Sequence, residues 1–231
     1  MKPGPNQPRD ISIKRVHIKQ TKTFEQLGIL VLDGSGSMEE QTAQHVTKAD
    51  AVTRAVNDFF SRFKASSICN NFSFAIVNYD HRSVVKMQPT QVKKIDDHGD
   101  YNPMDGLGGA TYISEGLKEA KKIAEDFLSR SVEGGLDRSV VILIMTDGVD
   151  MTKPETTSIA NTLKQMGKIK ICGCFFETLG ADEKSMHECE DYVKGLCTSP
   201  MDYSNVSDAD QLRTFFIKSM SVDDINLKQM I

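Results

Sequence analysis

The sequence contains no tryptophan, and aromatic residues make up 7% of its 231 residues. Long apolar runs are also missing, since stretches such as Val140–Met145 fall far short of the ~20 residues that span a bilayer. Neither charge sign dominates: the formal net charge is −4 and the sequence pI is near 5.8. The composition therefore gives no reason to expect a nucleic acid or a membrane as a partner.

Paired cysteines are lacking as well. The five cysteines are Cys69, Cys172, Cys174, Cys189 and Cys197. They form no C-x-x-C motif, and the proline-rich start of the chain has no apolar leader, so we expect reduced thiols and a cytoplasmic protein. A partial zinc site at His187, Cys189 and Cys197 fits no common ligand spacing.

Several motifs of nucleotide-binding proteins and hydrolases are absent. Gly34 and Gly36 lack the third glycine of the dinucleotide fingerprint, and no Gly-Lys-Ser/Thr phosphate loop occurs. No serine lies in the Gly-x-Ser-x-Gly pattern of a nucleophile elbow. The glycine-rich turns therefore need another explanation.

One of these turns follows an apolar run, Leu27–Leu32, which predicts a strand buried on both faces. Asp33, Ser35 and Ser37 come next at alternate positions, and the intervening glycines allow the backbone to turn tightly beneath them. Carboxylate and hydroxyl oxygens suit Mg²⁺, Mn²⁺ or Ca²⁺ rather than zinc. Three such groups do not complete a coordination shell, so other segments must add oxygen.

Two later segments supply it. Gly108 and Gly109 form a turn that leads to Thr111 and a helical pattern, and the apolar run Val140–Met145 ends in Thr-Asp-Gly with the acid at Asp147. With the first turn, these segments resemble the metal-ion-dependent adhesion site of the von Willebrand factor A family, over roughly residues 24–220. The resemblance implies that a divalent metal, Mg²⁺ with Mn²⁺ or Ca²⁺ as alternatives, is held by Asp33, Ser35, Ser37, Thr111 and Asp147.

Strands alternate with helices along the chain, which predicts an α/β fold with a doubly wound, mainly parallel sheet covered by helices on both faces. We expect about six strands, near 27–32, 72–79, 83–87, 140–146, 168–176 and 201–204. The tight connection at 80–82 makes 83–87 an antiparallel edge strand. The family resemblance implies the same Rossmann-like fold. We expect an N-terminal extension at 1–22 with a strand-like arm at 11–19, one domain at 23–221, and a tail at 222–231.

Local patterns give finer predictions. In the helix expected at 46–63, apolar residues including Val46 recur at helical spacing and face the sheet, while Lys48, Asp50, Arg54 and Asp58 face water. Thr152 and Glu155 have the spacing of a capping box. Asp80 and His81 are most simply turn residues, although they follow a strand and could border the metal site.

The resemblance implies a binding module rather than an enzyme: the metal would take an Asp or Glu carboxylate from another protein. A metal-dependent hydrolase acting on a phosphate ester is the alternative, but no histidine falls in a recognisable acid–base arrangement. A purely structural metal in a scaffold is the third possibility. The domain organisation is similar to intracellular family members of stress-response, tellurium-resistance, or kinase and phosphatase systems.

Overall fold

The computed structural model describes residues 24–130, 136–177, 180 and 182–220. The strands are β1 (Phe24–Asp33), β2 (Phe72–Tyr79), β3 (Ser83–Gln91), β4 (Asp137–Thr146), β5 (Ile169–Phe176) and β6 (Tyr203–Val206). The α-helices are α1 (Lys48–Ala65), α2 (Ile113–Ser129), α3 (Lys153–Gln165), α4 (Glu183–Leu196) and α5 (Ala209–Met220). Short 3-10 helices are η1 (Gly36–Glu39), η2 (Cys69–Asn71), η3 (Val92–Lys94) and η4 (Pro200–Asp202).

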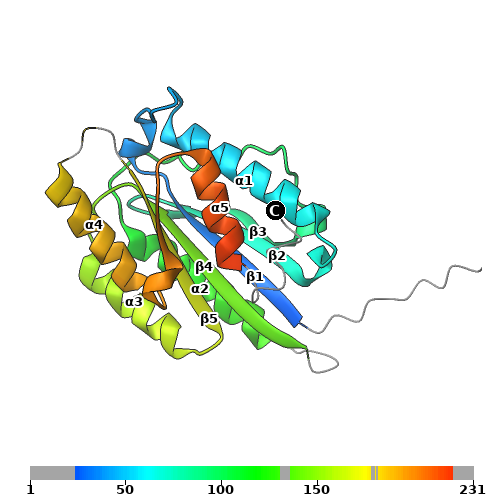
Figure 1. The fold of residues 1–231 in the computed structure, drawn as a ribbon. Coiled ribbons are helices and arrows are strands. Elements are labelled where there is room, and N and C mark those ends of the chain that lie inside the picture. The colour runs from blue at the N-terminus through cyan, green and yellow to red at the C-terminus, as the bar shows by residue number, and fades with distance from the viewer. Residues whose placement is uncertain (1–23, 131–135, 178–179, 181, 221–231) are drawn as a thin grey trace, which may run out of the picture.

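The strands form one six-stranded sheet in the order β3-β2-β1-β4-β5-β6 (Figure 1). All neighbouring pairs are parallel except β2 with β3. This confirms the prediction of a mainly parallel α/β sheet with one antiparallel edge strand. Strand β1 lies near the middle, and its apolar run from Leu27 to Leu32 is buried because helices cover both faces.

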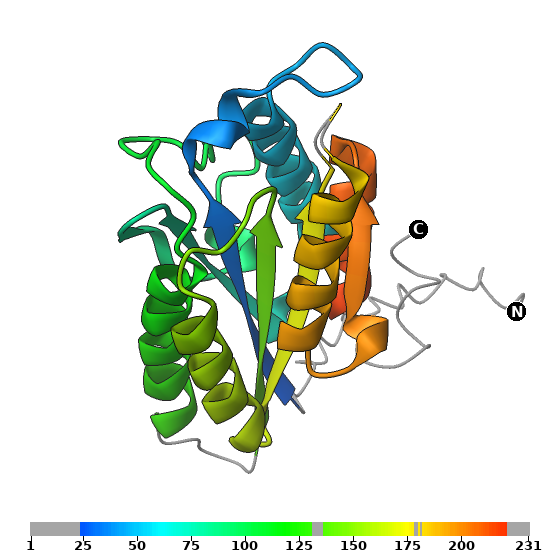
Figure 2. The ribbon, with the colours of Figure 1, turned by 90° about the vertical axis from the view of Figure 1, so that its left-hand side faces the viewer.

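Helices α1 and α5 pack together on one face of the sheet, and α2, α3 and α4 cover the other (Figures 1 and 2). The first face is rich in aromatic rings: Phe59, Phe60, Phe63, Phe72, Phe74 and Phe216. Phe59 lies with its ring centroid 5.0 Å from that of Phe74 and 5.6 Å from that of Phe216, so the rings tie α1 to both β2 and α5. The second face is mostly aliphatic.

Two local predictions, at the start of α3 and the start of β6, are wrong. Thr152 caps no backbone N–H at the start of α3, because its hydroxyl donates to the Asp150 carboxylate at 2.8 Å. Glu155, the other half of the expected capping box, instead pairs with Lys118 at 2.9 Å. The last strand begins at Tyr203 rather than Met201, because η4 occupies the preceding residues.

The extension at 1–22, with its strand-like arm at 11–19, and the tail at 222–231 lie outside the described residues. The domain bounds therefore stay predictions. None of the helices in the described part of the chain combines the length and apolar character that a bilayer span requires.

Candidate metal site

The carboxyl ends of β1, β4 and β5 point toward the same end of the molecule (Figure 2). Asp33 is the last residue of β1, and Asp147 directly follows β4. These strands are hydrogen-bonded neighbours in parallel register, with Leu32 opposite Met145, so the two aspartates emerge side by side. We call this edge the rim. A rim where parallel strands end is where ligands gather in such folds.

The loop after β1 is held tightly from several sides. Gly34 N donates to the carbonyl of Tyr79 at 2.7 Å, and Gly36 N donates to the carbonyl of Gly109 at 3.0 Å. A side chain at Gly34 would collide with the carbonyl oxygen of Pro103, so glycine is required there. These contacts bring the β1 loop against the loop that carries Thr111.

Four of the five predicted residues are joined by hydrogen bonds. Ser35 N donates to Asp33 Oδ1 at 2.8 Å, Ser35 Oγ lies 3.1 Å from Ser37 Oγ, and Ser37 Oγ donates to Asp147 Oδ1 at 2.7 Å. Asp33, Ser35 and Asp147 are at most 5% exposed, and Ser37 is half-buried. The three segments thus present oxygens to one small volume.

The fifth residue, Thr111, lies beside this group. A Cβ added to Gly148 would lie 3.0 Å from Thr111 Oγ1 and 3.9 Å from Ser37 Oγ, so both hydroxyls border the same glycine. Thr111 is 6% exposed, and its carbonyl accepts a hydrogen bond from Met151 N at 3.0 Å. The structure therefore brings all five predicted residues to the rim, and their role as ligands stays a prediction.

Two further aspartates position Thr111. Asp80 Oδ2 accepts hydrogen bonds from Gly108 N at 3.2 Å and Gly109 N at 3.0 Å, and it is 1% exposed. Asp150 Oδ1 accepts from Ile113 N, at the start of α2, at 3.2 Å. From the sequence, Asp80 was expected to be a turn residue that could border the metal site, and Asp150 was not predicted to have a role. Their positions directly after β2 and shortly after β4 were the available signal.

The carboxylate of Asp33 is unusual because it is fully buried near a second acid. Burial, and then the charge of Asp147, raise the pKa of Asp33 to about 7. Hydrogen bonds from Ser35 and from Thr146, whose Oγ1 donates to Asp33 Oδ2 at 2.7 Å, oppose this rise only in part. Two acids so placed repel each other, and a cation between them would relieve that repulsion.

The prediction that Lys48 faces water is wrong. Its side chain is 1% exposed, and its Nζ lies 2.7 Å from Asp147 Oδ2 and 2.8 Å from Glu40 Oε2. Because Lys48 begins α1 just behind the rim, a long side chain there reaches the acids. A lysine in the first turn faces the unfavourable end of the helix dipole, and this was the sequence signal that was missed.

The donor set fits a hard divalent cation, since it offers two carboxylates and three hydroxyls and no soft ligand. One carboxylate oxygen of Asp147 accepts a hydrogen bond from Ser37 Oγ, and the other accepts one from Lys48 Nζ. Among the described residues, no group of three or more His, Cys, Asp or Glu side chains is placed to hold a metal, so any site at the rim depends on hydroxyls. The zinc alternative is not formed: Cys197 Sγ donates to the carbonyl of Val193, and His187 contacts Glu190.

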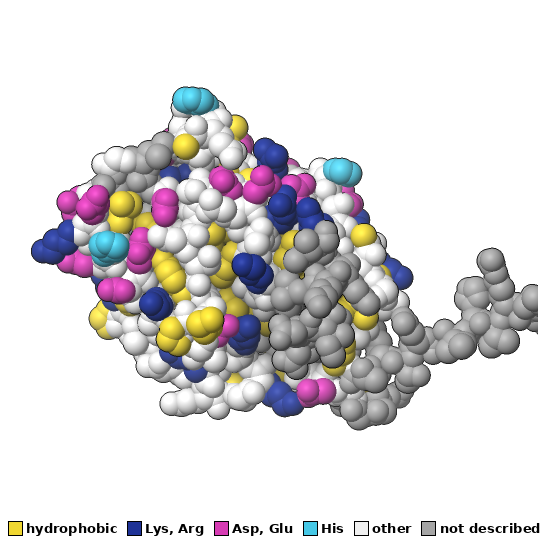
Figure 3. Space-filling model, in the orientation of Figure 1, with side chains coloured by type: hydrophobic (Ala, Val, Ile, Leu, Met, Phe, Trp, Pro, Cys, Tyr) yellow, Lys and Arg dark blue, Asp and Glu magenta, His cyan; other side chains and the backbone are white. Residues whose placement is uncertain are grey.

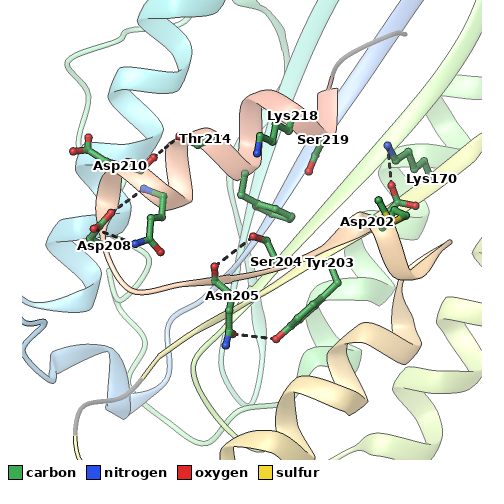
Figure 4. Close-up of a pocket in the computed structure, with 13 residues that line it drawn as sticks. Lys170, Asp202, Tyr203, Ser204, Asn205, Asp208, Asp210, Thr214, Lys218 and Ser219 are labelled. Atoms are coloured by element: carbon green, nitrogen blue, oxygen red, sulfur yellow. Dashed lines mark hydrogen bonds and ion pairs between the residues drawn. The ribbon is translucent and has the colours of Figure 1, made fainter. Parts of the chain in front are cut away.

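Two hollows on the described surface are relevant to function. The larger, a groove of about 530 Å³, lies between β6 and α5 and contains none of the five rim residues (Figure 4). On this side of the molecule basic and acidic side chains are interspersed over the described surface (Figure 3). The smaller hollow, of about 220 Å³, shares Ser37 and Asp147 with the rim.

A search of curated proteins finds no match. Solved structures with the same fold include the pilus adhesin SpaC of Lactobacillus rhamnosus GG, at 15% identity and a TM-score of 0.68, over 87% of this chain and 30% of that one. The chain thus spans less than a third of SpaC.

A second similar structure is the vWF domain of the type V pili tip protein Mfa5 from Porphyromonas gingivalis, with 12% identity and a TM-score of 0.60 over 86% of this chain and 94% of that domain. A third is a von Willebrand factor type A protein from Catenulispora acidiphila, with 17% identity and a TM-score of 0.60, covering 85% of this chain and 43% of that one. At these identities the likeness shows the fold alone. The model of the von Willebrand factor type A domain matches residues 29–150, more than half of the chain, and the chain therefore belongs to that family.

Proposed function

We propose that this domain is a metal-dependent binding module for another protein. Asp33, Ser35, Ser37, Thr111 and Asp147 would hold Mg²⁺, with Mn²⁺ or Ca²⁺ as alternatives, and the bound metal would supply a Lewis-acidic position for an Asp or Glu carboxylate of the partner. The observation that carries the proposal is the convergence of these side chains, from three separated segments, on one rim.

The charges around the rim bear on the choice of partner. Asp33 and Asp147 would balance a divalent cation, and the buried ammonium of Lys48 lies beside Asp147. Glu40, Asp80 and Asp150 add negative charge nearby, so it is the metal's vacant coordination position, rather than a net positive field, that would bind the carboxylate of a partner.

One contact bears on the hydrolase alternative. His81 Nδ1 lies 3.1 Å from Asp80 Oδ2, and the same carboxylate oxygen accepts hydrogen bonds from the two glycine N–H groups before Thr111. The hydrolase alternative predicts turnover of a phosphate ester that is lost in Asp147→Ala. We expect no turnover in either protein, and a rate well above background in the wild type would favour the enzyme.

The five cysteines are free thiols and all are buried. Free thiols suit a reducing, cytoplasmic location, which we propose. The proposed intracellular stress-response or signalling assembly rests on the resemblance to intracellular family members alone. If the metal were purely structural, its affinity would not change with a bound partner. Measuring Mg²⁺ affinity with and without the partner separates the two roles.

Partner capture tests the proposal directly. The immobilised full chain is incubated with cell extract in Mg²⁺, bound protein is eluted with EDTA, and the identified partner is purified and rebound. We expect rebinding to need Mg²⁺ and to disappear in Asp33→Ala. Rebinding that is unchanged in EDTA would contradict the proposal. Lys170→Met, in the distant groove, is the matched control and should rebind normally.

A further inference from the structure

We propose that the smaller hollow beside the rim receives an apolar side chain of the same partner segment that supplies the carboxylate. This inference rests on the proposed function, because it names the partner's chemistry at the same site. The binding surface for the partner would then have two parts: the metal position binds an acid, and the hollow binds a leucine-like side chain.

The hollow is continuous with the rim. Ser37, Asp147 and Gly148 line both, while the opposite wall comes from the end of β5 and the start of α4. The walls that face into it are mostly apolar, and the side chains that provide them are Val149, Phe175, Met186 and Cys189. A partner segment that touches the metal position therefore meets an apolar surface next to it.

The size of the hollow suits one side chain. Its volume of about 220 Å³ would hold several water molecules at about 30 Å³ each. Water in an apolar hollow makes few hydrogen bonds, so its replacement by an apolar group is favourable. A leucine, methionine or phenylalanine side chain fits this space, and a whole peptide segment does not.

One exposed apolar side chain lines the hollow: Val149, in the loop after β4, is 50% exposed. Exposed large apolar side chains also occur elsewhere in the described residues, the most exposed being Met201 at the larger groove, 91% exposed. What distinguishes Val149 is that it lies beside Asp147 and Gly148 at the rim. An apolar residue next to a charged site is typical of a surface that a partner covers.

The spacing of the two groups in the partner follows from strand geometry. In an extended segment, side chains alternate between opposite faces, so residues i and i+2 point the same way about 7 Å apart. An acid and an apolar residue that both enter this face are therefore separated by one residue. Either order along the partner satisfies this requirement.

Synthetic pentapeptides test the inference. The first has a central glutamate with serine on each side and leucine at both ends; the second replaces both leucines by serine; the third replaces the glutamate by glutamine. Each is titrated into the full chain with excess Mg²⁺ and with EDTA, and binding is followed by NMR. We expect the leucine–glutamate peptide to bind about tenfold more tightly than its serine counterpart, and only in Mg²⁺.

A surface variant locates the effect. Val149→Ser removes an exposed apolar wall and should not affect folding, so we expect it to weaken the leucine–glutamate peptide about threefold and leave the serine peptide unchanged. Met151→Ser is the matched control, because Met151 lies in the same loop and is exposed but does not line the hollow. The methyl signals of Val149 and Met186 should shift with the leucine peptide alone.

The outcomes separate the two proposals. Equal, Mg²⁺-dependent binding of the leucine and serine peptides would overturn this inference and leave the proposed function standing. If the leucine peptide binds equally well when its glutamate is replaced by glutamine, or when EDTA removes Mg²⁺, both the proposed function and the two-part binding surface are overturned. Absence of any peptide binding in Mg²⁺ would count against both.

Discussion

The two hollows of this domain differ in a way that size does not predict. In the larger groove the polar side chains satisfy one another: Lys170 pairs with Asp202 at 3.0 Å, and Tyr203 donates to Asn205 at 3.0 Å. The smaller hollow instead adjoins the rim, where Asp33 is a buried acid whose pKa is raised to about 7 by burial and by Asp147, and where Lys48 pairs with Asp147. Closely spaced buried charges, rather than volume, therefore point to the candidate functional site.

The largest predicted effect comes from breaking the buried pair at the rim. Lys48→Met leaves Asp147 without its ammonium partner, and we expect the metal-free protein to lose about 3–5 kcal/mol of unfolding free energy. Mg²⁺ should recover more stability in this variant than in the wild type, because it replaces the missing cation. Since the chain has no tryptophan, urea unfolding is followed by circular dichroism. Equal Mg²⁺ effects in both proteins would contradict this prediction.

Asp33→Asn keeps the shape of the side chain and removes its charge. We expect Mg²⁺ affinity to fall at least about 100-fold, or about 2.7 kcal/mol, because a carboxylate ligand is lost. The metal-free variant should be no less stable than the wild type, since the charged form of this buried acid is disfavoured. Calorimetric titration with Mg²⁺ measures the first effect and urea unfolding the second. If Asp33→Asn binds Mg²⁺ with the wild-type affinity, Asp33 is not a metal ligand.

Asp80→Ala tests the residue that holds the Thr111 loop. Two glycine N–H groups lose their acceptor, and water can replace it in part, so we expect a loss of about 1–2 kcal/mol in stability. Mg²⁺ affinity should fall about tenfold, because Thr111 is less well positioned. Asp105→Ala is the control: Asp105 is also an acid near this loop, but it is exposed and pairs only at the surface with Lys86. An Asp105 variant that behaves like Asp80→Ala would refute the positioning role.

The smallest effect is expected in the larger groove. Lys170→Met breaks an ion pair whose lysine side chain is 39% exposed, so we expect a stability change of less than about 1 kcal/mol. Mg²⁺ affinity should stay at the wild-type value in the same calorimetric titration. A clear change in metal affinity would mean that the groove and the rim are coupled, and the contrast between them would fail.

Most of the fold was predictable because the apolar runs that form β1, β4 and β5 are long enough for buried strands and end in polar turns. Predictions failed at the ends of helices and strands, where a local pattern such as apolar spacing did not match the residue at which the element starts. Val46 continues the apolar spacing of α1 but is 41% exposed, because Thr47 caps the helix by accepting from Asp50 N at 3.0 Å. Strand β6 has four residues, too few for a periodic pattern to fix its start.

By itself the sequence determined the strand-end positions of Asp33 and Asp147, and the family pattern that adds Ser35, Ser37 and Thr111 to them. The tertiary structure alone decided that Lys48 is buried against Asp147, that Asp80 and Asp150 hold the Thr111 loop, and that an apolar hollow borders the rim. The physical reason is that side-chain alternation and glycine turns are local properties of the chain. Burial, charge pairing and hollows depend instead on which distant segments the packed sheet brings together.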